Sequence, residues 1–146
     1  MLINTAVLGQ VDVDPNNIFH LPGGLYGFER ASDYALITKQ DEDFTLMLFQ
    51  SVEGLAPCFV VFNPYDIFED YTPAMEAGDL KALGVSGVDE LSFFVIAVVP
   101  EDVHEISVNL KSPIAVNRKK KMARQVILSN TDYPIKYPLF GDEQEK

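Results

Sequence analysis

Short apolar runs, separated by glycine, proline, asparagine and aspartate, recur along most of this chain. The runs are four to nine residues long and rich in Val, Ile, Phe and Thr, which is typical of β-strands. The stretch AVLGQVDV (6–13) alternates in its second half, with Gly9 as a turn or bulge. CFVVF (58–62) and FFVIAVV (93–99) are apolar at successive positions, which predicts central strands covered on both faces. We predict further strands at residues 34–38, 44–52, 106–110, 114–117 and 124–128.

Helical patterns are scarce. In TPAMEAGDLKALGV (72–85), Asp79 is the expected N-cap of a short helix that ends at Gly84. The predicted fold class is mostly β: a small closed or partly open antiparallel β-barrel-like single domain with one or two short helices. A barrel is preferred because closure removes exposed strand edges. The domain is expected to span residues 1–140, and the acidic tail GDEQEK (141–146) is expected to be frayed.

Composition narrows the class of protein. A chain of 146 residues can bury one sizeable core, and the apolar fraction of 47% argues against disorder despite a net charge of −11. No apolar run is long enough to span a membrane, no signal peptide is recognisable, and Cys58 is the single cysteine. We therefore expect a cytoplasmic protein without membrane contact. Its acidic surface should repel nucleic-acid phosphates and attract a basic protein.

Candidate catalytic and metal-binding groups are few. The chain has two histidines, and HEISV (104–108) lacks the second histidine that a zinc protease helix requires. DVDPNN (12–17) has Asn17 where a calcium loop needs glycine, and GGLYGF (23–28) lacks the lysine of a phosphate loop. We predict no enzyme, no metal and no cofactor, with Cys58 as a small buried hydrophobic residue.

Two segments are candidates for partner binding. LPGGLYGFE (21–29) forms a compact loop that is either a plug in the barrel mouth or a contact loop. Its candidate contact residues are Leu25, Tyr26 and Phe28. NPYDIFEDYTP (63–73) either covers the core or offers aromatic anchors ringed by acids. Its candidate residues are Tyr65, Asp66, Phe68, Glu69, Asp70 and Tyr71.

The stretch NLKSPIAVNRKKKMARQVIL (109–128) differs from the acidic remainder. Residues 111–131 carry six basic side chains and no acidic one. The favoured interpretation is a charged hairpin tip at residues 117–121, between two strand-like runs. The alternative is a nucleic-acid-binding β-barrel module that uses the basic hairpin 118–124. That alternative is disfavoured because no aromatic side chain is available there for base stacking. A ligand-binding barrel mouth is a third possibility.

Five motifs, in register over nearly the whole length, resemble the FliW family of flagellar assembly factors. They are INTAVLGQVDVD (3–14), LPGGLYGFE (21–29), FQSVEGLAPCFVVFNPYDIFEDYTP (49–73), NLKSPIAVNRKKKMARQVIL (109–128) and YPIKYPL (133–139). Members often carry a tryptophan in the strand before Gln50 and Ser51, whereas this chain has no tryptophan.

The resemblance implies a non-enzymatic protein that switches between two partners. One is the carbon storage regulator CsrA, an RNA-binding repressor of flagellin synthesis, which the family antagonises. The other is flagellin, whose secretion would free the factor to relieve repression. No direct binding of nucleic acid is expected. The basic nature of such a regulator agrees with the acidic surface, and the resemblance favours a grip away from the RNA face over competition with RNA.

Overall fold

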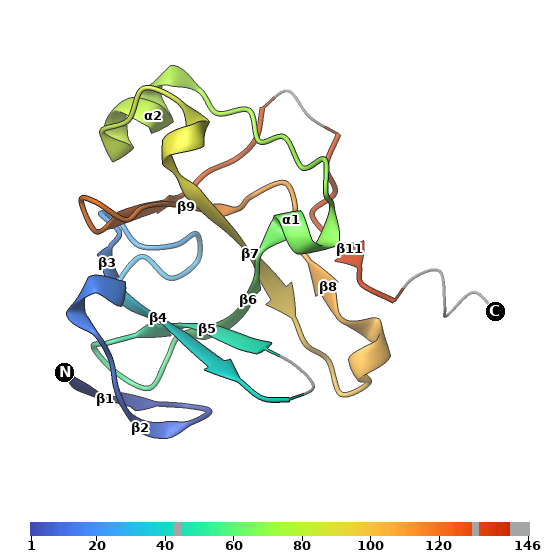
Figure 1. The fold of residues 1–146 in the computed structure, drawn as a ribbon. Coiled ribbons are helices and arrows are strands. Elements are labelled where there is room, and N and C mark those ends of the chain that lie inside the picture. Colours follow the sequence, from blue (N-terminus) through green and yellow to red (C-terminus); the bar gives the residue numbers. More distant parts are fainter. Residues whose placement is uncertain (43–44, 130–131, 141–146) are drawn as a thin grey trace.

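The computed structural model describes residues 1–42, 45–129 and 132–140 (Figure 1). The predicted frayed tail, 141–146, lies outside the described residues. The first six strands are β1 (Leu2–Thr5), β2 (Gly9–Asp12), β3 (Ile18–His20), β4 (Asp33–Gln40), β5 (Thr45–Ser51) and β6 (Cys58–Phe62). The others are β7 (Ser92–Val98), β8 (Ser107–Val108), β9 (Ile114–Asn117), β10 (Met122–Gln125) and β11 (Tyr137–Pro138). Helical segments are η1 (Pro15–Asn17), α1 (Pro64–Ile67), α2 (Ala77–Leu83), η2 (Val88–Glu90) and η3 (Val103–Glu105).

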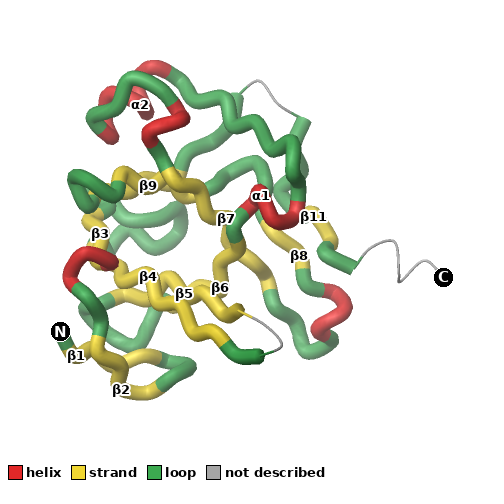
Figure 2. The backbone as a smooth tube through the Cα atoms, in the orientation of Figure 1, coloured by secondary structure: helices red, strands yellow, loops and turns green. Residues whose placement is uncertain are grey.

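Strands close into a barrel in the order β7-β6-β5-β4-β3-β10-β9, and β9 pairs with β7 again. Neighbours around the barrel are antiparallel except β3 and β10, which meet in parallel through the pair Met122↔His20. β8 and β11 extend the sheet beyond the barrel from the last residues of β7. The strands form the body of the molecule and the helices are short (Figure 2). The predicted fold class is confirmed.

Side chains fill the barrel interior. Its buried cluster includes Phe19, Tyr34, Phe49, Phe94 and Ile114. The rings of Tyr34 and Phe49 stack at 4.8 Å between centroids, on facing positions of β4 and β5. Phe49, in the strand before Gln50 and Ser51, is buried in this cluster.

Two further apolar layers cover the outside of the barrel. β1 and β2 form a separate hairpin beside β4 and β5 (Figure 1), where Ile3 and Val13 pack with Leu48. On another side, α1, α2 and the chain end cover Phe93 and Val95 of β7. Strand β6 and the first half of β7 therefore have apolar neighbours on both faces, as predicted. The prediction was wrong for the end of the run, because Val98 and Val99 are 63% and 48% exposed.

Several predicted boundaries were wrong, each for a local reason. The run 124–128 is strand only as far as Gln125. Beyond that residue, the segment opposite it in the same chain is Pro113, which has no amide N–H to continue the ladder. The N-cap of α2 is Glu76, whereas Asp79 lies in its first turn and pairs with Arg124 at 2.8 Å. Gly84 ends α2 as predicted, in the left-handed conformation with φ of 71°. Among the described residues, no helix combines the length and the apolar character needed to cross a membrane.

Candidate partner-binding surfaces

The acidic-aromatic segment 63–73 leaves the end of β6 and begins with α1. Asn63 caps this helix by accepting a hydrogen bond from the backbone N–H of Tyr65 at 2.9 Å, and Pro64 occupies the first turn. The side chains of Tyr65, Asp66, Glu69 and Asp70 are exposed. These four predicted contact residues therefore lie on one short, capped segment at the surface.

The remaining two predicted contact residues, Phe68 and Tyr71, support the segment from beneath. Tyr71 is only 3% exposed, and its hydroxyl donates to the carbonyl of Leu110 at 2.6 Å. Its ring lies 4.7 Å from that of Tyr133, and Phe68 contacts both Tyr133 and Tyr137. Burial and the neighbouring tyrosines raise the pKa of Tyr71. The expectation of an exposed anchor at Tyr71 is therefore corrected, because its hydroxyl and ring are occupied within the fold.

Next to α1, a hollow of about 530 Å³ lies at one end of β6 and β7. Tyr65 and Asp66 line it together with Phe94 and with Arg118 of the basic hairpin. The Arg118 guanidinium lies 5.9 Å from the Phe94 ring centroid and donates to the Ser92 hydroxyl at 3.1 Å. The structure thus joins two segments that the sequence treated separately.

The loop 21–29 is partly buried in the barrel and partly exposed at the surface. Leu25 is 1% exposed and packs into the barrel cluster, whereas Tyr26 and Phe28 are 59% and 46% exposed. Gly24 permits this tight path, since its φ is 70° and a Cβ there would meet the Phe28 carbonyl oxygen at 2.6 Å. The plug is confirmed for Leu25, and contact by Tyr26 and Phe28 stays a prediction.

A second concavity, here named the β7–β8 groove, begins beside this loop. It measures about 380 Å³, and its lining includes Tyr26, Phe28, Phe59, Val98, Ile135 and Lys136. The ring of Phe28 meets Phe59 edge-on at 5.1 Å. Ile135 and Lys136 were missed as site residues, although the motif YPIKYPL that contains them was recognised.

The basic stretch is a hairpin tip, as predicted. Asn117 closes β9, and its side-chain oxygen accepts from the backbone N–H groups of Lys119 and Lys120 at 3.2 Å. Its amide donates to the Leu83 carbonyl at 2.7 Å and so fixes the turn to α2. Arg124 pairs with Asp79. The guanidinium groups of Arg118 and Arg124 are therefore engaged in the fold, whereas the side chains of Lys119, Lys120 and Lys121 are exposed at the tip.

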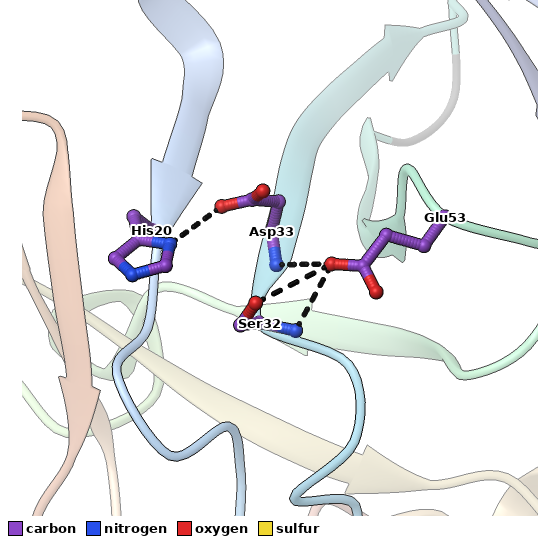
Figure 3. Close-up of polar contacts among 4 residues, drawn as sticks. All are labelled: His20, Ser32, Asp33 and Glu53. Carbon is purple, nitrogen blue, oxygen red and sulfur yellow. Dashed lines mark hydrogen bonds and ion pairs between the residues drawn. The ribbon is translucent and has the colours of Figure 1, made fainter.

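Four further polar residues form a connected set of contacts: His20, Ser32, Asp33 and Glu53 (Figure 3). Glu53 lies in the connection between β5 and β6. A carboxylate oxygen of Glu53 accepts from the backbone N–H groups of Ser32 and Asp33 at 3.3 and 3.2 Å, and His20 contacts Asp33 at 2.7 Å. This arrangement ties two loops together. No group of three His, Cys, Asp or Glu side chains suited to a metal occurs in residues 1–42, 45–129 and 132–140.

Comparisons with known proteins agree with this architecture. Residues 2–139 match the family model described as FliW protein. A flagellar assembly factor FliW of Thermoanaerobacter pseudethanolicus is 31% identical over 142 residues, covering 97% of this chain and 95% of the relative. That of Thermotoga neapolitana is 34% identical over 146 residues, covering 99% and 97%. A crystal structure of the flagellar assembly factor FliW has a TM-score of 0.84 at 28% identity, covering 96% of this chain and 97% of that one.

Proposed function

This chain belongs to the FliW family, and on that premise we propose that it is a flagellar assembly factor that acts by binding proteins rather than by catalysis. In this proposal its partners are a CsrA-type RNA-binding regulator and flagellin. Binding to the regulator antagonises its repression of flagellin mRNA, and flagellin binding withdraws the factor. The amount of unsecreted flagellin then controls its own translation.

The observation that carries the regulator half of the proposal is the exposed surface around α1. Asp66, Glu69 and Asp70 are exposed beside Tyr65, and the aromatic contacts of Phe68 and Tyr71 hold their backbone in place. A fixed backbone reduces the entropy lost on binding, so an aromatic side chain there is suited to be an anchor. The carboxylates are suited to the rim of an interface with a basic protein.

The charges should act mainly on the rate of association. The chain carries a net charge of −11, so a basic partner is attracted over a distance set by the Debye length, about 8 Å at physiological salt. Individual exposed ion pairs contribute only about 0.2–1 kcal/mol each. We therefore assign the affinity to the aromatic anchor Tyr65 and the steering to the acids around it.

A displacement titration tests the proposal. A labelled CsrA-type regulator is mixed with this protein, complex formation is followed by fluorescence anisotropy, and flagellin monomer is then added. The expected result is binding that weakens with salt, followed by release of the labelled regulator. The variant Tyr65→Ala should weaken the complex, whereas Val7→Ala, at an exposed apolar position in the turn between β1 and β2, serves as the control. Absence of a complex at both low and physiological salt would remove the regulator role.

A further inference from the structure

The β7–β8 groove is an uncovered apolar surface in a protein that otherwise covers the barrel on several sides. Val98 and Ile135 are 63% and 66% exposed, and Tyr26 is 59% exposed at the rim. Scattered exposed apolar residues are normal, but several around one concavity mark a binding site. Here they come from three separate parts of the chain and meet at one place.

The sheet itself explains why this surface is open. β6 pairs with β7 through Val61↔Ile96 and Phe62↔Val95, while Ala97 and Val98 of β7 pair with β8 on the other edge. The end of β7 therefore leaves the barrel and carries the inward-facing side chains of Ile96 and Val98 with it. The face that is interior elsewhere becomes the floor of the groove.

Charge distinguishes this groove from the surface around α1. Among the described residues that line it, Lys136 is the charged one. Glu105 lies beyond it, in the adjoining hollow that Lys136 also lines. The charged side chains exposed on the α1 segment are instead the acids Asp66, Glu69 and Asp70. A basic partner is therefore favoured at the surface around α1, whereas the β7–β8 groove offers it no acidic side chain among the residues that line it.

We propose that the β7–β8 groove binds flagellin monomer, through a segment with two or three apolar side chains and a carboxylate placed against Lys136. The inference rests on the proposed function and deepens it, because it assigns the two partners to different surfaces. The apolar side chains enter between the loop bearing Tyr26 and Phe28 and the segment bearing Ile135. The carboxylate pairs with Lys136 at the rim, where it contributes orientation more than affinity.

The test measures both partners on the same set of variants. Val98→Asp and Ile135→Asp place a charge in the groove at positions that are exposed, so the fold should persist. Val7→Asp, in the exposed turn between β1 and β2, is the matched control. Binding of purified flagellin monomer and of the CsrA-type regulator is measured by calorimetry, and folding by circular dichroism.

The expected result is a loss of at least about tenfold in flagellin affinity for both groove variants, with regulator affinity unchanged and the control like the wild type. Lys136→Glu should weaken flagellin binding more at low salt than at high salt, and Lys136→Gln should do so less.

The alternative outcomes are distinguishable. If the wild type binds flagellin and the folded groove variants bind it equally well, the inference fails and the proposed function stands. If the wild type binds neither partner, both the proposed function and the inference fail. If the groove variants lose only the regulator, the assignment of partners is reversed. A wild-type dimer that the groove variants dissociate, with flagellin binding retained, would make the occupant a second copy of this chain.

Discussion

Two buried tyrosines differ in what their hydroxyl groups contact, so replacing each by phenylalanine should affect stability in opposite ways. The hydroxyl of Tyr71 donates to the carbonyl of Leu110 at 2.6 Å. The hydroxyl of Tyr34 lies inside the barrel and has no hydrogen-bond partner among the described residues. Both side chains are nearly inaccessible, with exposed fractions of 3% and 0%, so water does not compensate from the surface.

The magnitudes follow from these contacts. Tyr71→Phe deletes a buried hydrogen bond and leaves the Leu110 carbonyl without that donor, which should lower the free energy of unfolding by about 1–2 kcal/mol. Tyr34→Phe removes a hydroxyl that was desolvated without compensation, while the ring still stacks on Phe49. The free energy of unfolding should then stay the same or rise by up to about 1 kcal/mol.

Urea denaturation of the wild type and both variants, followed by fluorescence and circular dichroism, measures the difference. The dependence on urea should be the same in all three, because neither change alters the surface exposed on unfolding. The melting temperatures should differ in the same order, by about 3–4 °C per kcal/mol. An equal loss of stability in Tyr34→Phe and Tyr71→Phe would refute the reasoning, since it would require an equivalent partner for the Tyr34 hydroxyl.

Further predictions concern pH, the hairpin and the charged surface. Burial, reinforced by Glu53, raises the pKa of Tyr34 to about 12, and burial also raises that of Tyr71. The unfolded chain ionises first, so the free energy of unfolding should hold up to about pH 10 and fall above it, less steeply in Tyr34→Phe. Asn117→Ala removes three hydrogen bonds of a buried side chain and should lower the free energy of unfolding by about 2–4 kcal/mol in urea titrations, whereas Lys119→Ala should be neutral. Glu69→Lys should slow association with the regulator and flatten its salt dependence in stopped-flow measurements, and an unchanged rate would move the acidic interface elsewhere.

The strands that the sequence predicts best are those with a continuous run of apolar residues. CFVVF and IAVN are β6 and β9 with the predicted bounds, because a strand with apolar neighbours on both faces needs a nearly continuous apolar sequence. β3 has three residues, of which only Phe19 is buried, so its sequence holds no periodic signal. Its parallel pairing with β10 joins Met122 to His20 and follows from barrel closure, which no local pattern reports.

The candidate surfaces were predicted in part for the same reason. Charged side chains such as Asp66 and Glu69 stay exposed in most settings, so their location could be expected from their type. The burial of Tyr71 depends on Leu110, 39 residues further along the chain, and on Tyr133. The β7–β8 groove likewise combines residues that are far apart in the sequence, such as Phe28, Val98 and Lys136. Contacts between distant segments decide both features, and one sequence does not contain them.

The positions of the two surfaces limit how flagellin could displace the regulator. Phe94 of β7 lines the hollow beside α1, and Val98 lines the β7–β8 groove. Four residue steps of extended strand separate them, about 13 Å, which is less than the width of a small protein domain. Displacement therefore has two physical routes: overlap of the bound partners, or coupling through the filled barrel, for which about 1–3 kcal/mol is typical.

Fragment size separates the two routes. A short flagellin peptide that fills the groove is too small to reach α1, so it displaces the regulator only if the sites are coupled through the barrel. The full monomer displaces it in either case. Because the barrel interior between the two surfaces is packed, we expect the rigid route: release by the monomer and retention with the peptide. Release by the peptide at saturation would instead require two arrangements of these strands with different affinities for the regulator.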